Sequence, residues 1–189
     1  MNIQHGVDTE KLEKFVQFAA QNPEDVQLEL RTRSIYEGTA AHSLAEIKAY
    51  QLGDAEIERE TREYTIPYGG WREVLDQAGW VGAMDRMEPI EVALSALASC
   101  INVGISINAL ASGVDIESLE TRVQADFNPG VLFGLQDVDE SDTVFSNFRA
   151  DIDVSADVDP ERIEEWARRA PVYAMMSLGQ DIGMQISKA

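Results

Sequence analysis

The sequence predicts an α+β fold with a mostly antiparallel sheet wrapped around one long buried helix. Three short alternating segments follow one another between residues 25 and 67, with turns at Gly38 and Gly53, which is typical of an antiparallel meander. After Glu91, no charged residue occurs up to residue 111, and this run is too long for a strand. No internal repeat and no long linker interrupts the 189 residues, so a single main domain is expected.

Composition and charge place the chain among soluble globular proteins. The formal net charge is -19, hydrophobic residues make up 44% of the sequence, and the mean hydropathy is -0.22. Such a charge repels nucleic acid and anionic membrane surfaces, so neither is expected as a partner. The first residues lack an apolar core segment, so we expect no signal peptide and a cytoplasmic location. Acidity together with few lysines, 4 against 11 arginines, also suggests a salt-rich habitat.

The first expected element is an amphipathic helix over residues 8–21. Asp8 is a suitable N-cap, apolar residues recur on one side, and Asn22-Pro23 ends the pattern. We expect this helix to lie on the core as an N-terminal extension, residues 1–24, ahead of a single domain at residues 25–189. A partner-binding arm is the alternative.

Alternating segments then predict three strands joined by short turns. They cover residues 25–36, 42–52 and 57–67. In the first strand the polar side chains, among them Arg31 and Arg33, point away from the apolar ones. A short helix is expected at residues 71–78, followed by an apolar loop at residues 80–83 that either caps the core or lines a pocket.

The long helix is expected at residues 89–111. Pro89 suits its first turn and Gly113 suits its end. Because apolar and small residues occupy all its sides, we expect it to be buried on every side. Its length would also suit a membrane span, but five polar residues and the absence of flanking basic clusters argue against one. Its small residues favour packing against its own copy or within a sheet.

The second half of the chain adds strands and helices. Strands are expected at residues 116–127, 143–157 and 182–187, and helices at residues 160–170 and 171–179. In the first of these helices we expect Ile163, Trp166 and Ala167 to face inward. The acidic segment 131–142 is interpreted as a solvated loop, since it lacks the ligand spacing of an EF-hand calcium loop.

Cys100 is the only cysteine and lies in the middle of the long helix. A single cysteine allows no intrachain disulfide, and with only His5 and His42 as histidines no metal site is expected. Cys100 is either inert packing or a reactive thiol. It lies too far along its helix to profit from the helix dipole, so a reactive thiolate would need a cation from elsewhere in the fold, for which Arg31 and Arg33 are candidates.

The run from Pro89 to Cys100 resembles the central helix of the OsmC/Ohr family, which reads approximately P-x-E-x-L-L-x-A-L-x-x-C. The element order from residue 25 to residue 189 is also similar. The resemblance implies an intertwined homodimer with two active sites at the subunit interface. It also implies reduction of organic hydroperoxides by two cysteines, in which an arginine and a glutamate polarise the first cysteine and an external dithiol restores the enzyme.

The chain departs from this family pattern at two positions, and the place of a third family residue has two alternatives. Cys100 matches the first cysteine, but Ala170 stands where the family has the second. The family glutamate directly follows the proline, where this chain has Ile90 and places Glu91 one residue further on. The family arginine is best matched by Arg33, although Glu37 is the alternative occupant of its place.

The resemblance therefore predicts an OsmC-like homodimer without cofactor or metal. Cys100, Arg33 and Glu91 are the candidate catalytic residues of a one-cysteine organic hydroperoxide reductase that is recycled by an external thiol. The alternative is a non-catalytic protein that binds a small apolar ligand on the same scaffold. The lining residues expected for that pocket are Trp80, Met84, Met87, Met175 and Met176.

Overall fold

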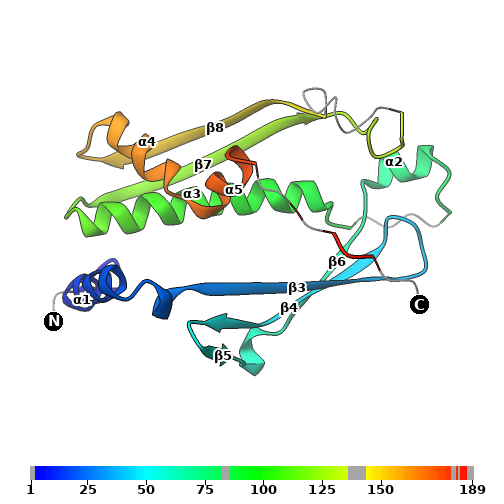
Figure 1. The fold of residues 1–189 in the computed structure, drawn as a ribbon. Coiled ribbons are helices and arrows are strands. Elements are labelled where there is room, and N and C mark those ends of the chain that lie inside the picture. Colours follow the sequence, from blue (N-terminus) through cyan, green and yellow to red (C-terminus); the bar gives the residue numbers. More distant parts are fainter. Residues whose placement is uncertain (1–2, 82–85, 136–143, 180–181, 183, 187–189) are drawn as a thin grey trace. The chain divides into compact units, whose positions relative to one another are not determined.

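The structure is a computed structural model that describes residues 3–81, 86–135, 144–179, 182 and 184–186. The chain consists of two compact units, residues 1–93 and residues 94–189. Both units combine helices with antiparallel strands, which confirms the predicted α+β class (Figure 1). The domain boundary after residue 24 stays a prediction.

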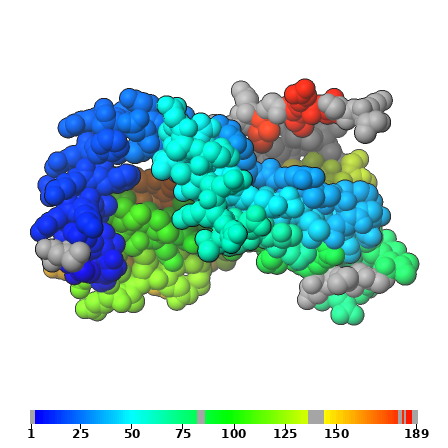
Figure 2. Space-filling view, turned by 90° about the horizontal axis from the view of Figure 1, so that it is seen from below, coloured from blue at the N-terminus to red at the C-terminus, as the bar shows by residue number. Residues whose placement is uncertain are grey.

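Unit 1 begins with a small hairpin that the sequence analysis did not predict, followed by the expected helix. Strands β1 (Ile3–Gln4) and β2 (Val7–Asp8) pair with each other, and α1 (Thr9–Gln21) follows, with the Asp8 carboxylate accepting the N–H of Lys11 at 3.3 Å. That this helix lies on the core stays a prediction. None of its residues is buried, and its segment is visible at the surface (Figure 2, dark blue). Phe15 is 56% exposed.

The predicted meander is present, with its third strand divided in two. After a 3-10 turn at Glu24–Val26, the strands are β3 (Leu28–Tyr36), β4 (Ser43–Leu52), β5 (Ala55–Ile57) and β6 (Tyr64–Tyr68). Both β5 and β6 pair with β4, at its end and at its start respectively, and a 3-10 turn at Glu60–Arg62 separates them. The single predicted strand at residues 57–67 was therefore wrong, because its highly charged middle leaves the sheet.

The strand register gives this sheet one apolar and one polar face. Leu30 lies opposite Tyr50, which lies opposite Ile57, whereas Arg33 lies opposite Glu46 on the other face. The apolar face carries Leu28, Leu30, Ile47, Tyr50, Leu52, Ile57, Tyr64 and Ile66. Among the described residues of unit 1, only Leu75 is a buried hydrophobic residue, so unit 1 by itself leaves this apolar face incompletely covered.

The end of unit 1 connects the sheet to the long helix. The predicted short helix is α2 (Arg72–Gln77), which carries the buried Leu75. Met87 then forms a β-bridge with Tyr68, and the Glu88 carboxylate accepts two free N–H groups from the first turn of α3 (Pro89–Ala111). The long helix thus has the predicted bounds and an acidic cap.

Unit 2 surrounds one hydrophobic cluster. The paired strands β7 (Ile116–Phe127) and β8 (Phe145–Ala156) pack with α3 and with two short helices, α4 (Pro160–Arg168) and α5 (Pro171–Ser177) (Figure 1). The buried members of the cluster are Leu97, Ile101, Ile105, Ala109, Ile163, Trp166, Ala167 and Ala170. The three residues predicted to face inward from α4, which are Ile163, Trp166 and Ala167, are all among them.

The prediction that α3 is buried on every side is wrong for the single chain. Only four of its residues are buried, while Val103 and Ile107 are 51% and 52% exposed, because the cluster of unit 2 takes up one side of the helix. By length and composition α3 would also suit a membrane span, which is weak evidence because the core helices of soluble proteins meet the same criteria. In the structure, the side-chain oxygen of Asn102 on α3 accepts a hydrogen bond from the hydroxyl of Thr121 on β7 at 2.7 Å.

Two further predictions concern the segments after β7 and after α5. The predicted final strand is wrong for its described residues, 182 and 184–186, which form no strand. A strand needs a partner strand, and these residues pair with none in the described part of the chain. Most of the acidic loop, residues 136–142, lies outside the described residues, as does Met84.

We predict that Gly104→Val destabilises the protein by about 1–3 kcal/mol, since an added side chain overpacks the core. A Cβ atom at position 104 would lie only 3.1 Å from the carbonyl oxygen of Trp166. Urea unfolding measures the loss. Ala111→Val adds the same side chain at the exposed end of the same helix and serves as the control. Equal effects of the two substitutions would show that the close approach at Gly104 is unimportant.

Candidate thiol site on helix α3

Cys100 lies in the middle of α3, at the edge of the unit 2 cluster. The thiol is partly exposed and packs against the buried residues. Its Sγ accepts a hydrogen bond from the backbone N–H of Val172 at 3.5 Å, although 72 residues separate the two positions. The side chain therefore combines access to solvent with a donor group that can stabilise a negative sulfur.

The break between α4 and α5 creates this contact. Helix α4 ends at Arg168, and Ala170, which is fully buried, is the N-cap residue of α5. Pro171 occupies the first helical position and has no N–H, so Val172 supplies the first N–H group of α5. Gly104, one turn after Cys100, leaves the space that lets Trp166 and Ala170 approach α3.

The cations closest in sequence to this break are already paired. Arg168 donates to the carboxylate of Glu164 and to the hydroxyl of Tyr173 at 2.7 Å. The hydrogen bond to Glu164 is the main cause that raises the pKa of Arg168, which stays charged. Arg169 binds Glu165 and the side-chain oxygen of Asn108, which lies on α3 two turns after Cys100. This network holds the start of α5 against α3.

Arg33 lies on the polar face of the unit 1 sheet. Its side chain is 72% exposed, and its guanidinium lies 3.8 Å from the carboxylate of Glu46. Because Arg33 belongs to unit 1 and Cys100 to unit 2, their proximity stays a prediction.

Glu91 lies in the first turn of α3 and is exposed. Nine residues separate it from Cys100, which corresponds to about 2.5 helical turns and about 13.5 Å along the axis. The two side chains thus leave the helix on opposite sides. Within one chain Glu91 therefore does not contact Cys100, and its role in polarising the thiol stays a prediction that requires a second copy.

Sequence reasoning missed a partly buried ion pair between Arg86 and Glu37. Arg86, only 16% exposed, donates to the Glu37 carboxylate at 2.5 Å and to the carbonyl oxygen of Tyr68 at 3.4 Å. Gly69 makes room for it, since a Cβ there would lie 2.8 Å from the Cβ of Arg86. No local sequence signal indicates this pair, because 49 positions separate the two residues.

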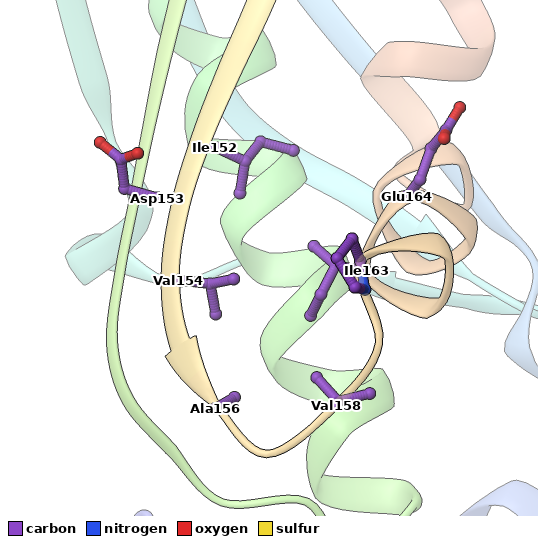
Figure 3. Close-up of a pocket in the computed structure, with 8 residues that line it drawn as sticks. Ile152, Asp153, Val154, Ala156, Val158, Ile163 and Glu164 are labelled. Carbon is purple, nitrogen blue, oxygen red and sulfur yellow. The ribbon is translucent and has the colours of Figure 1, made fainter.

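A groove of about 500 Å³ lies between β8 and α4 (Figure 3). Its aliphatic lining comprises Ile152, Val154, Ala156, Val158, Pro160 and Ile163, and Asp153 and Glu164 lie at its margin. The expected pocket residues Trp80, Met87, Met175 and Met176 do not line this groove. Trp80 instead donates its indole N–H to the carbonyl oxygen of Ala40, and Met175 is 57% exposed.

No cluster of three or more metal-ligating His, Cys, Asp or Glu side chains is found in the described part of the chain. The site thus consists of the Cys100 thiol, the Val172 N–H that contacts it and the apolar side chains around it.

The site is thus a cysteine on a long helix that packs with a β-ribbon and a broken pair of short helices in an α+β fold. The family model described as OsmC-like protein matches residues 82–184, which is more than half of the chain. The chain therefore belongs to the OsmC-like family. A comparison with curated proteins gave no match.

Three solved structures are also similar to this chain. An OsmC-like protein from Mycoplasma pneumoniae has a TM-score of 0.50 and 12% identity, over 78% of this chain and 86% of that one. An OsmC-like protein of unknown function from Vibrio cholerae has a TM-score of 0.47 and 14% identity, over 77% and 91%. A Psychrobacter arcticus 273-4 protein assigned to osmotic stress and detoxification responses has a TM-score of 0.46 and 17% identity, over 75% and 84%. At such identities the likeness concerns the fold alone.

We predict that Ala170→Cys forms a disulfide with Cys100 on mild oxidation with diamide. Ala170 lies two residues before the N–H that contacts Sγ and belongs to the same buried cluster. Peptide mapping without reduction should show positions 100 and 170 linked. Ser177→Cys, at the exposed end of α5, adds a thiol away from the break and should keep both thiols free. Two free thiols in the Ala170→Cys protein would show that residue 170 does not face Cys100.

Proposed function

We propose that this protein is a one-cysteine thiol peroxidase that reduces organic hydroperoxides with Cys100. The observation that carries the proposal is the partly exposed thiol whose sulfur accepts the Val172 N–H. A buried structural cysteine would have neither solvent access nor a donor directed at its sulfur. Membership of the OsmC-like family makes a thiol site on this helix a reasonable expectation.

The proposed reaction begins with the Cys100 thiolate. Its sulfur attacks the outer oxygen of the hydroperoxide, the O–O bond breaks, and the alkoxide leaves and takes up a proton to become an alcohol. Cys100 becomes a sulfenic acid and is oxidised by two electrons while the peroxide is reduced. Before attack, the backbone N–H of Val172 donates a hydrogen bond to the sulfur at 3.5 Å.

The surroundings of the thiol favour an organic substrate over hydrogen peroxide. Cys100 packs against a cluster of aliphatic and aromatic side chains that includes Leu97, Ile101 and Trp166. Contact with these side chains makes binding of a hydroperoxide with an apolar substituent more favourable, whereas hydrogen peroxide has no apolar substituent. The specificity expected from one small apolar contact is about 10-fold to 200-fold.

The proposed catalytic cycle needs an external thiol. The sequence has no second cysteine, and Ala170 stands where the family has one. A small thiol or a dithiol would attack the oxidised Cys100 to form a mixed disulfide, and a second thiol would release the reduced enzyme. No cofactor is part of this proposal, and the setting we propose is the cytoplasm.

We also propose that the working form is a homodimer. One side of α3 presents a stripe of small and apolar residues, namely Ala96, Ser99, Val103 and Ile107, at helical spacing. The apolar face of the unit 1 sheet is also half exposed, with Leu30 at 68%. Surfaces of this kind on both units are typical of a chain whose core is completed by another molecule. In a dimer, a copy of Glu91 or Arg33 from the partner could reach Cys100.

We predict that cumene hydroperoxide oxidises Cys100 at least about tenfold faster than hydrogen peroxide does, because the apolar surround binds the larger substrate. Stopped-flow measurement, with intact mass after a sulfenic-acid trap, follows one oxidation per chain. Cys100→Ser, which keeps size and removes the thiol, is the control and should be inert.

A rate no better than that of free cysteine would remove the peroxidase proposal. The second candidate function would then be binding of a small apolar ligand in the groove between β8 and α4 (Figure 3). That groove is the observation that favours it, because its lining is aliphatic.

We predict that Val103→Glu or Ile107→Glu weakens self-association about tenfold or more. Each dimer would bury two unpaired carboxylates, and every 1.4 kcal/mol of lost binding energy lowers the affinity tenfold. Sedimentation velocity over a range of concentrations measures the effect. Ala150→Glu places the same charge at an exposed position of β8 and should leave association unchanged. A monomeric unmodified protein would contradict the dimer proposal itself.

A further inference from the structure

We propose that oxidised Cys100 condenses with the backbone nitrogen of Val172 to form a cyclic sulfenamide, which takes the protective role of the absent second thiol. This inference rests on the proposed peroxidase function and describes the fate of its sulfenic acid. The juxtaposition that carries it is the 3.5 Å distance between the Cys100 Sγ and the Val172 nitrogen.

The chain presents one suitable nitrogen at this place. The N–H of Ala170 is occupied by the carbonyl oxygen of Ala167 at 3.1 Å, and Pro171 has no N–H. Val172 is the second residue of α5, where the N–H groups of a helix have no intrahelical acceptor. Replacing this N–H by an N–S bond therefore removes no hydrogen bond from the helix.

The surrounding packing keeps the two atoms together. Cys100 lies within an unbroken helix, and the residue before Pro171 is the fully buried Ala170. Gly104 brings that segment against α3, and Arg169 ties it there through Asn108. Bond formation needs the sulfur to close the remaining distance, which rotation of the Cys100 side chain and a small shift of the first turn of α5 can supply.

The step balances without a further oxidant. The hydroperoxide first converts the thiolate to a sulfenic acid and is itself reduced to an alcohol. The Val172 nitrogen then attacks the sulfur, the S–O bond breaks, and hydroxide leaves with the amide proton as water. An external thiol reduces the sulfenamide again. It attacks the sulfur, the N–S bond breaks, and the nitrogen regains its proton. A second thiol then reduces the mixed disulfide that this step forms.

The consequence is protection from irreversible oxidation. A sulfenic acid with no thiol partner can react again with peroxide to give the sulfinic acid, which ordinary thiols do not reduce. The sulfenamide removes the reactive S–OH group and stays reducible. A one-cysteine enzyme with such a step would survive excess hydroperoxide until an external thiol became available.

The test is intact-mass spectrometry of the full chain after one equivalent of cumene hydroperoxide, without trap or thiol. The sulfenamide is about 2 Da lighter than the reduced protein, whereas the sulfenic acid is about 16 Da heavier. Because the sequence has one cysteine, this loss cannot come from an intrachain disulfide. We expect the lighter species to predominate, to yield a peptide linking positions 100 and 172, and to return to the reduced mass with dithiothreitol.

Val172→Pro removes the reacting N–H and should accumulate trappable sulfenic acid, while Val172→Ala keeps the N–H and should behave like the unmodified protein. If Val172→Pro does not fold, the linked peptide of the unmodified protein still decides. A stable sulfenic acid with no lighter species, or a disulfide between two chains, would overturn the sulfenamide and leave the peroxidase proposal standing. Absence of any oxidation of Cys100 would overturn both.

Discussion

The close approach of the α4–α5 break to α3 is the contact on which the rest of unit 2 depends. Gly104 permits it, because a larger side chain would meet the backbone of Trp166. Trp166, 1% exposed, and Ala170, fully buried, then fill the space between the helices and the β7–β8 ribbon. Without this approach the cluster would lose its centre, and the first N–H of α5 would not reach Cys100.

The same contact gives the thiol its chemistry. Pro171 starts α5 without an N–H, so the Val172 N–H is the group directed at sulfur. The nearby arginines are committed to carboxylates, and Arg169 also ties α5 to α3. Their role is thus to hold the backbone donor in place. A backbone donor and an apolar surround suit the proposed attack on an organic hydroperoxide.

Unit 1 is governed by the opposite constraint, a shortage of core. Its sheet has a well-formed apolar face, yet Leu75 is the one buried hydrophobic residue among its described positions. A sheet of this size needs its apolar face covered to be stable. The proposed homodimer would cover that face. It would also allow a second copy of Glu91, which leaves its own helix on the side opposite to Cys100, to approach the thiol.

The sequence by itself determined the class of fold, the bounds of the long helix, the inward residues of α4 and the family, because hydrophobic periodicity and a helix motif are local properties. It did not determine the split of the third strand, the half-exposed sides of α1 and α3, or the loss of the final strand, since these depend on which surfaces find partners. The contact between Cys100 and Val172 and the pair of Arg86 and Glu37 join residues 72 and 49 positions apart. Only tertiary structure could decide them, because no periodic pattern records which distant backbone or charge a side chain will meet.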